Sequence, residues 1–188
     1  MLGSLFLAAV LTGLALSGPA AAKTLRLTYT PFAADGQVRA DLNVVRRDGE
    51  CFFASLKVAR GYRCVTGNLL RDPCYADVSR DSTEVVCAAA PWSRTLVRIA
   101  LSEDLPRRDP SPLAAPPYWA LVLASGARCT FISGATAVVR GFRLNYGCDD
   151  GRVLFGSPRR SSSTWRIRVA RDGTGRGMRL AAIREAWR

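Results

Sequence analysis

The chain has 188 residues, and its 27 Lys or Arg residues against 15 Asp or Glu residues give a formal net charge of +12. It contains no histidine. The missing imidazole excludes Ser-His-Asp and Cys-His hydrolases, histidine-dependent zinc proteases and ribonucleases with paired histidines. A hydrophobic fraction of 48% with 22% charged residues is typical of a folded globular protein.

Residues 1–22 have the pattern of an export signal. They contain no charged side chain, and an apolar run over 5–16 is followed by a Gly-Pro pair and three alanines. The run is short for a membrane span, and the alanines match a cleavage site. We therefore expect cleavage after Ala22. Because no Lys or Arg precedes the run, an uncleaved anchor is the alternative. The protein is predicted to be secreted, either extracellular or associated with the cell wall.

The exported part contains an even number of cysteines, which in an oxidising compartment predicts three disulfides. Spacing favours three local bridges, Cys51 to Cys64, Cys74 to Cys87 and Cys129 to Cys148, because each closes a short loop within a plausible hairpin. Other pairings remain open. A zinc site is disfavoured, since the chain lacks both a CxxC pair and histidine. We expect no metal and no cofactor.

Period-two alternation of apolar and polar residues indicates half-buried strands. It is clearest over Val38–Val44, Val97–Leu101 and Trp165–Val169. Further strands are expected over Thr24–Thr30, Tyr118–Ala124, Arg128–Ile132, Val138–Tyr146 and Arg152–Phe155. Gly-containing pairs that favour hairpin turns lie beside or between these runs, at Asp35-Gly36, Asp48-Gly49, Ser125-Gly126, Asp150-Gly151 and Asp172-Gly173.

The predicted fold class is all-β, a mainly antiparallel sandwich or barrel stapled by disulfides, with at most one or two short helices. Only Phe52–Arg60 and Met178–Trp187 are helix candidates, and the second also alternates, which favours a closing strand. Five of the ten prolines lie in a loop over 105–117. This loop could separate subdomains 23–104 and 118–188, but each alone would bury little apolar surface. We therefore predict a single domain over 23–188.

Four segments support a resemblance to known proteins: GYRCVTGNLLRDPCYAD (61–77), VVCAAAPW (85–92), LASGARCTFISGAT (123–136) and LNYGC (144–148). With them, residues 49–148 and, weakly, the terminal Ala186-Trp187 resemble a group of uncharacterised secreted proteins of high-GC Gram-positive bacteria. The resemblance implies an exported, disulfide-bonded domain. It carries no established activity.

Positive charge is concentrated towards the C-terminus. Residues 125–188 carry 13 Arg against four acids, whereas residues 23–124 carry 14 basic residues against 11 acids. Codon bias explains the 25 Arg against two Lys but not this asymmetry. The candidate anion-binding residues are Arg140, Arg143, Arg159, Arg160, Arg166 and Arg168. Phe142 and Tyr146 alternate with Arg140 and could stack on bases or sugars; alternatively, they lie in the core beneath a solvated face.

Without histidine, catalysis would depend on carboxylates, one of them with a raised pKa. The candidates are Asp72, Asp77, Asp81, Glu84, Glu103, Asp149 and Asp150, and none stands out. Asp72-Pro73-Cys74 and Asp149-Asp150-Gly151 are most simply turns, and Ser55-Leu56-Lys57 lacks the S-x-x-K spacing of serine acyl enzymes.

The sequence therefore favours a non-catalytic binding domain at the cell envelope or outside the cell. Its predicted partner is an anionic wall polymer, an anionic membrane surface or an acidic protein, and no specific nucleic-acid motif is present. The alternatives are a carboxylate-dependent hydrolase of envelope polysaccharide and a protease-inhibitor-like module that presents the loop 105–117.

Overall fold

A computed structural model describes residues 22–76, 83–105 and 118–188, and their secondary structure contains strands but no helix. The predicted all-β, disulfide-stapled fold is confirmed. Residues 1–21, Asp77, Asp81 and 106–117 of the proline-rich loop lie outside the described residues. Within the described part of the chain, no helix has the length and apolar character needed to cross a membrane.

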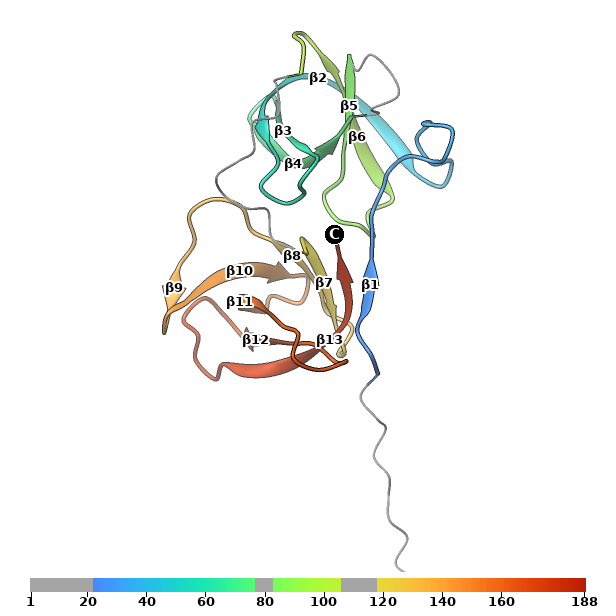
Figure 1. Cartoon of the computed structure of the whole chain (residues 1–188). Helices are drawn as coiled ribbons and strands as arrows, with labels where there is room; N and C mark the ends of the chain where they lie inside the picture. Colours follow the sequence, from blue (N-terminus) through green and yellow to red (C-terminus); the bar gives the residue numbers. More distant parts are fainter. Residues whose placement is uncertain (1–21, 77–82, 106–117) are drawn as a thin grey trace, which may run out of the picture.

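Five strands form the first barrel, at the top of Figure 1. They are β2 (Asn43–Ala54), β3 (Tyr62–Thr66), β4 (Leu69–Tyr75), β5 (Glu84–Cys87) and β6 (Thr95–Leu101). Neighbours pair antiparallel in chain order, and β2 closes the barrel by pairing parallel with β6 over Asn43–Gly49. Beyond Gly49, β2 pairs with β3 instead.

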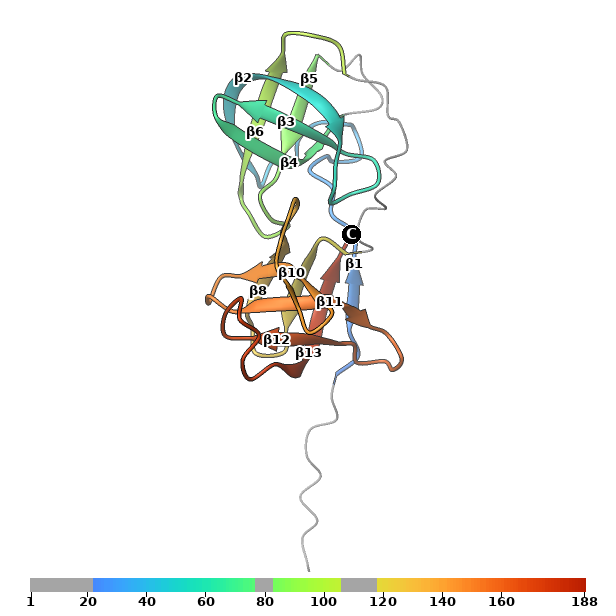
Figure 2. The ribbon, with the colours of Figure 1, turned by 90° about the vertical axis from the view of Figure 1, so that its left-hand side faces the viewer.

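The second barrel lies below the first in Figures 1 and 2. Its strands are β7 (Ala120–Leu123), β8 (Arg128–Phe131), β10 (Phe142–Cys148), β11 (Val153–Arg159), β12 (Arg166–Ala170) and β13 (Arg179–Trp187). They pair in this order, and the pairing of β13 with β7 closes the ring. The short β9 (Val138–Val139) pairs with β10, and β1 (Leu25–Leu27) adds parallel to β13.

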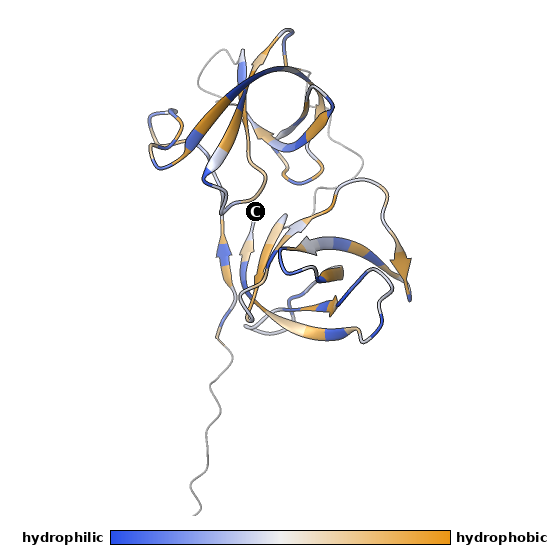
Figure 3. Ribbon diagram, turned by 180° about the vertical axis from the view of Figure 1, so that it is seen from behind, coloured by the Kyte–Doolittle hydropathy of each residue, from blue (hydrophilic) through white to orange (hydrophobic). Residues whose placement is uncertain are grey.

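Each barrel has its own core, and a third cluster lies between them. The first barrel buries Val85 and Ile99 around its two disulfides, and the second buries Leu154, Ile167 and Ile183. The third cluster joins residues of the first barrel, such as Leu96, to residues next to or within the second, such as Trp119 and Ala120. In both barrels, hydrophobic and hydrophilic residues succeed one another along the strands (Figure 3), as the alternation in the sequence predicted.

The three local disulfides favoured by spacing are confirmed: Cys51–Cys64, Cys74–Cys87 and Cys129–Cys148. Each joins residues directly opposite each other on two antiparallel strands. The bridges are therefore cross-strand staples within one barrel.

Two sequence expectations for the first barrel were wrong. Residues 38–42 form an isolated bridge from Val38 to Phe32 and a turn, so the strand begins only at Asn43. Val38 and Leu42 instead pack against the cluster between the barrels, which produces alternation without a strand. Asp48-Gly49 lies inside β2 and not in a turn.

The secondary structure of other segments also bears on the sequence predictions. Phe52–Arg60 is the end of β2 followed by a loop, and the tail is the strand β13, as its alternation favoured. Asp72-Pro73-Cys74 continues β4 through a cis Asp72-Pro73 peptide bond and is not a turn. The sequences of β3, β4 and β5 show no clear alternation of apolar and polar residues. Burial alternates along β3 but comes in runs along β4 and β5.

Candidate functional site

Three arginines gather on the outer face of the second barrel where β11 and β12 pair. Arg159 lies directly opposite Arg166. Residues directly opposite in an antiparallel pair project from the same face. Arg168 follows two residues after Arg166 and projects from that face as well, because side chains alternate along a strand. Ile167 and Val169, between and after them, point into the core.

Aromatic rings hold two guanidinium groups at this surface. The Arg168 guanidinium carbon lies 3.5 Å from the centroid of the Phe142 ring. Partial desolvation, followed by repulsion from Arg159, lowers the pKa of Arg168 from its usual value. Arg160, which follows the end of β11, lies over the Trp165 ring at 5.9 Å. We call Arg159, Arg160, Arg166 and Arg168 the arginine face.

None of the four residues of the arginine face forms an ion pair with a carboxylate in the described part of the chain. Acids elsewhere do neutralise arginines: the pairs are Arg39 with Asp41, Arg46 and Arg98 with Glu84, Arg152 with Asp150, and Arg184 with Glu185. Like charges directly opposite each other destabilise a sheet. The arginine face therefore has a local excess of positive charge with no internal compensation.

The remaining two predicted binding residues have other surroundings. The Arg143 guanidinium donates to the carbonyl oxygen of Gly134 at 2.6 Å and to that of Ile132 at 3.4 Å, and it also bonds the Asn145 side chain. Its donors are engaged in holding the loop after β8. Arg140 is exposed in the turn between β9 and β10 and has a positive φ of 51°. Neither Arg143 nor Arg140 therefore belongs to the arginine face.

The alternation of Phe142 and Tyr146 with Arg140 suggested that both rings lie on one face of β10. In the structure they lie on different faces. A register shift between Leu144 and Tyr146 changes the phase of the strand. Phe142 contacts Arg168 on the outside, whereas Tyr146 is buried and its hydroxyl donates to the Tyr118 carbonyl at 2.8 Å. A β-bulge of this kind cannot be predicted from period-two alternation.

The described candidate carboxylates lie at several places in the fold, and Glu103 is exposed in the segment after β6. Asp149 accepts a hydrogen bond from the Arg128 amide, and Asp150 binds the Arg152 side chain, so both stabilise the ends of the hairpin between β10 and β11. Glu84 lies between two arginines on the first barrel. Among the described residues, Asp72 is the only acid that lines a cavity in the first barrel. The contacts of these described acids give no support to a paired-carboxylate hydrolase.

A polar cluster next to β4 was not predicted from the sequence. The Ser55 hydroxyl donates to Asp72 and accepts from the amides of Lys57 and Val58 at 2.9 and 3.0 Å. The second Asp72 oxygen accepts from the Leu56 amide at 3.1 Å. Burial raises the pKa of Asp72 and lowers that of Lys57. These four hydrogen bonds engage the Ser55 hydroxyl and both Asp72 oxygens, so Ser55 is not a free nucleophile.

Three sulfurs of the first barrel, from Cys64, Cys74 and Cys87, lie within 4.8 Å of one another. All three belong to disulfides. Metals bind thiolates, which a disulfide does not offer. The closeness of these sulfurs results from two neighbouring cross-strand bridges.

Comparison of the chain with protein-family models, with curated proteins and with solved structures finds no match.

Proposed function

We propose that the protein is an exported, non-catalytic domain that binds an anionic polymer outside the cell through the arginine face. The observation that carries this proposal is the direct opposition of Arg159 and Arg166, next to Arg168, without a carboxylate partner in the described residues. The three disulfides are typical of proteins that fold in an oxidising compartment.

Anion binding would relieve the repulsion within the face. Arg159 and Arg166 are cross-strand neighbours, whose side chains start about 5 Å apart, and Arg168 lies about 7 Å further along β12. One anionic group would bridge the first two residues, and the next group along a polymer would contact Arg168. A guanidinium that lies over a ring, as Arg168 lies over Phe142, can still offer its N–H edge for the two parallel hydrogen bonds that phosphate or carboxylate accepts.

An anionic wall polymer fits this face best among the predicted partners, because a polymer presents regularly spaced charges to a row of cations. Binding would then depend on salt, since each neutralised charge releases counterions.

The test uses heparin as a soluble polyanion probe and purified anionic wall polymer as the second ligand. In one variant, Arg159, Arg160, Arg166 and Arg168 are all replaced by Gln. In the matched control, Arg39, Arg46, Arg47 and Arg60 are replaced by Gln. Both variants lose four positive charges from a net charge of +12, so long-range attraction falls equally.

We expect the first variant to bind at least about tenfold more weakly at low salt and to lose most of the salt dependence, in line with the loss of direct contacts to the polyanion. The control should stay within about twofold of the wild type. Melting temperatures should change little in both, because exposed charges contribute little to stability. Equal losses in the two variants would refute a localised binding face.

A further inference from the structure

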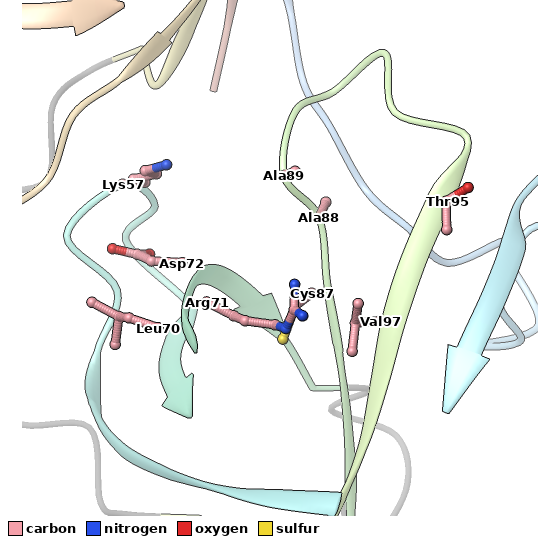
Figure 4. A pocket seen from close by; sticks show the side chains of 9 residues that line it. All are labelled: Lys57, Leu70, Arg71, Asp72, Cys87, Ala88, Ala89, Thr95 and Val97. Carbon is pink, nitrogen blue, oxygen red and sulfur yellow. The ribbon is translucent and has the colours of Figure 1, made fainter. Parts of the chain in front are cut away.

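The first barrel contains a cavity of about 240 Å³ that the arginine face does not involve. Its wall is formed by β4, the start of β6 and the segments that follow β2 and β5. Lys57, Arg71 and Asp72 line it together with apolar side chains that include Leu70, Ala88 and Val97 (Figure 4). The cavity therefore combines cations with an apolar surface.

The two cations of the cavity have unused hydrogen-bonding capacity. The Lys57 ammonium makes no side-chain hydrogen bond or ion pair with any residue that the structure describes. Arg71 donates from Nε to the Thr66 hydroxyl at 2.9 Å, and it forms no ion pair within the described ranges. Asp72 acts on Lys57 through its charge, which opposes the lowering of the Lys57 pKa, but it forms no ion pair with Lys57 or Arg71 within the described residues.

We propose that this cavity binds a small organic carboxylate. Lys57 and Arg71 would hold the carboxylate, and Leu70, Ala88 and Val97 would contact the apolar part of the ligand. The positive charges of Lys57 and Arg71 exceed the negative charge of Asp72 by one. This net charge of +1 matches a monocarboxylate. The proposal is independent of polyanion binding, because the arginine face lies on the second barrel.

The size of the cavity suits a small ligand. An apolar cavity of about 150 Å³ is sufficient for benzene. A cavity of about 240 Å³ is therefore large enough for a molecule of the size of benzoate. Burial lowers the pKa of Lys57, and a bound carboxylate would raise it again by stabilising the ammonium.

The test exploits the presence of only two lysines in the exported chain, Lys23 and Lys57. Protein labelled with ¹³C and ¹⁵N on lysine gives one set of side-chain resonances for each. Benzoate is the probe, and neutral benzamide is the matched ligand without charge. The protein is titrated with each compound, and the pKa of both lysines is measured with and without saturating benzoate.

We expect benzoate to shift the Lys57 resonances and to raise the Lys57 pKa, while Lys23 stays unchanged. Benzamide should bind at least about tenfold more weakly, because it lacks the charge-assisted hydrogen bonds. Lys57→Gln should weaken benzoate binding to a similar extent, whereas Lys23→Gln should have no effect. The variant without the arginine face should bind benzoate as the wild type does, which separates this site from the proposed function.

Ala89, an exposed residue at the rim, offers a second variant that leaves the charges intact. Ala89→Phe should block the cavity and abolish the benzoate shift at Lys57 while the melting temperature is retained. Equal shifts at both lysines, no shift at either, or wild-type affinity in Ala89→Phe would overturn the proposal.

Discussion

Thr24 shows how one buried hydroxyl can hold three segments together. Its hydroxyl donates to the Ile183 carbonyl at 2.7 Å and accepts from the Trp165 amide at 2.8 Å. Its own amide donates to the Ser163 carbonyl at 3.0 Å. The residue thus connects the segment just before β1 to the region where β12 and β13 pair.

We expect Thr24→Val to lower the free energy of unfolding by about 1–3 kcal/mol, because it leaves a buried donor and a buried acceptor without their partner. Urea denaturation measures the change. Thr28→Val is the control at an exposed position, for which a change within about 0.5 kcal/mol is expected. A cost at Thr24 no larger than that at Thr28 would contradict this role for the hydroxyl.

Lys57 predicts a pH dependence of stability. Burial lowers its pKa in the folded protein below the usual 10.5, and the Asp72 charge opposes this shift. Between the folded pKa and 10.5, the unfolded chain binds more protons than the folded chain, so stability rises with pH in this window. Relative to Lys57→Gln, the wild type should become more stable as pH increases towards 10.5.

Denaturation of both proteins at a series of pH values measures this difference. Lys23→Gln should follow the wild type throughout, since Lys23 is exposed. A difference between wild type and Lys57→Gln that does not change with pH would show that Lys57 has the same pKa in both states.

At the scale of elements, Gly49 marks the point where β2 exchanges one partner strand for another. A Cβ atom at this position would lie 2.2 Å from the carbonyl oxygen of Val65 on β3. The close approach of two backbones requires glycine here. An Asp-Gly pair normally indicates a turn, and this different use of glycine explains why the turn expected at 48–49 was wrong.

We expect Gly49→Ala to destabilise the protein by about 1–3 kcal/mol, the usual cost of overpacking. Gly147 in β10 is the matched control, because a Cβ there would meet only Ile132 side-chain atoms, the nearest at 3.5 Å. Gly147→Ala should be neutral or stabilising by up to about 1 kcal/mol. Thermal denaturation compares the two variants, and equal effects would rule out the contact with Val65 as the cause.

The predictability of each element follows from its surroundings. The three disulfides could be predicted because each bridges neighbouring strands, so spacing along the chain reflects spacing in the sheet. The parallel closure of β2 on β6 could not, because it joins residues about 50 positions apart and has no local pattern.

The same distinction holds for the candidate sites. Alternation around Trp165–Val169 predicts that the side chains of Arg166 and Arg168 point outward. This prediction needs only residues that are neighbours in the sequence. The opposition of Arg159 and Arg166 depends on a register shift between Phe155 and Arg159. The cavity brings Lys57 and Thr95 together from separate strands and loops, and no motif links them. Charge patterns could thus be predicted, but the geometry of the sites could not.

At the scale of the whole molecule, the chain connects the two barrels more than once. β1 belongs to the second barrel, the chain then forms the first barrel, and it returns at β7. Tyr29, just after β1, packs edge to face against Trp119 with 5.8 Å between ring centroids, and its ring lies 5.7 Å from that of Tyr75 in β4. Trp187 also packs against the cluster between the barrels, so this cluster combines residues from both ends of the described chain.

This cluster leads us to expect one cooperative unfolding transition. Leu96 in β6 and Leu154 in β11 are both fully buried, the first between the barrels and the second in the core of the second barrel. Replacing either with Ala should cost about 2–5 kcal/mol. If the barrels unfold together, each substitution destabilises both.

Hydrogen exchange of peptides that cover β3 and β12 measures the two barrels separately in the same sample. Under native conditions, Leu96→Ala and Leu154→Ala should each accelerate exchange in both strands, and the acceleration should correspond to the loss of global stability. Barrels that are stable independently would behave differently: Leu154→Ala would affect β12 alone, and calorimetry would show two transitions. That result would favour two subdomains over the single domain that the small size of each half suggests.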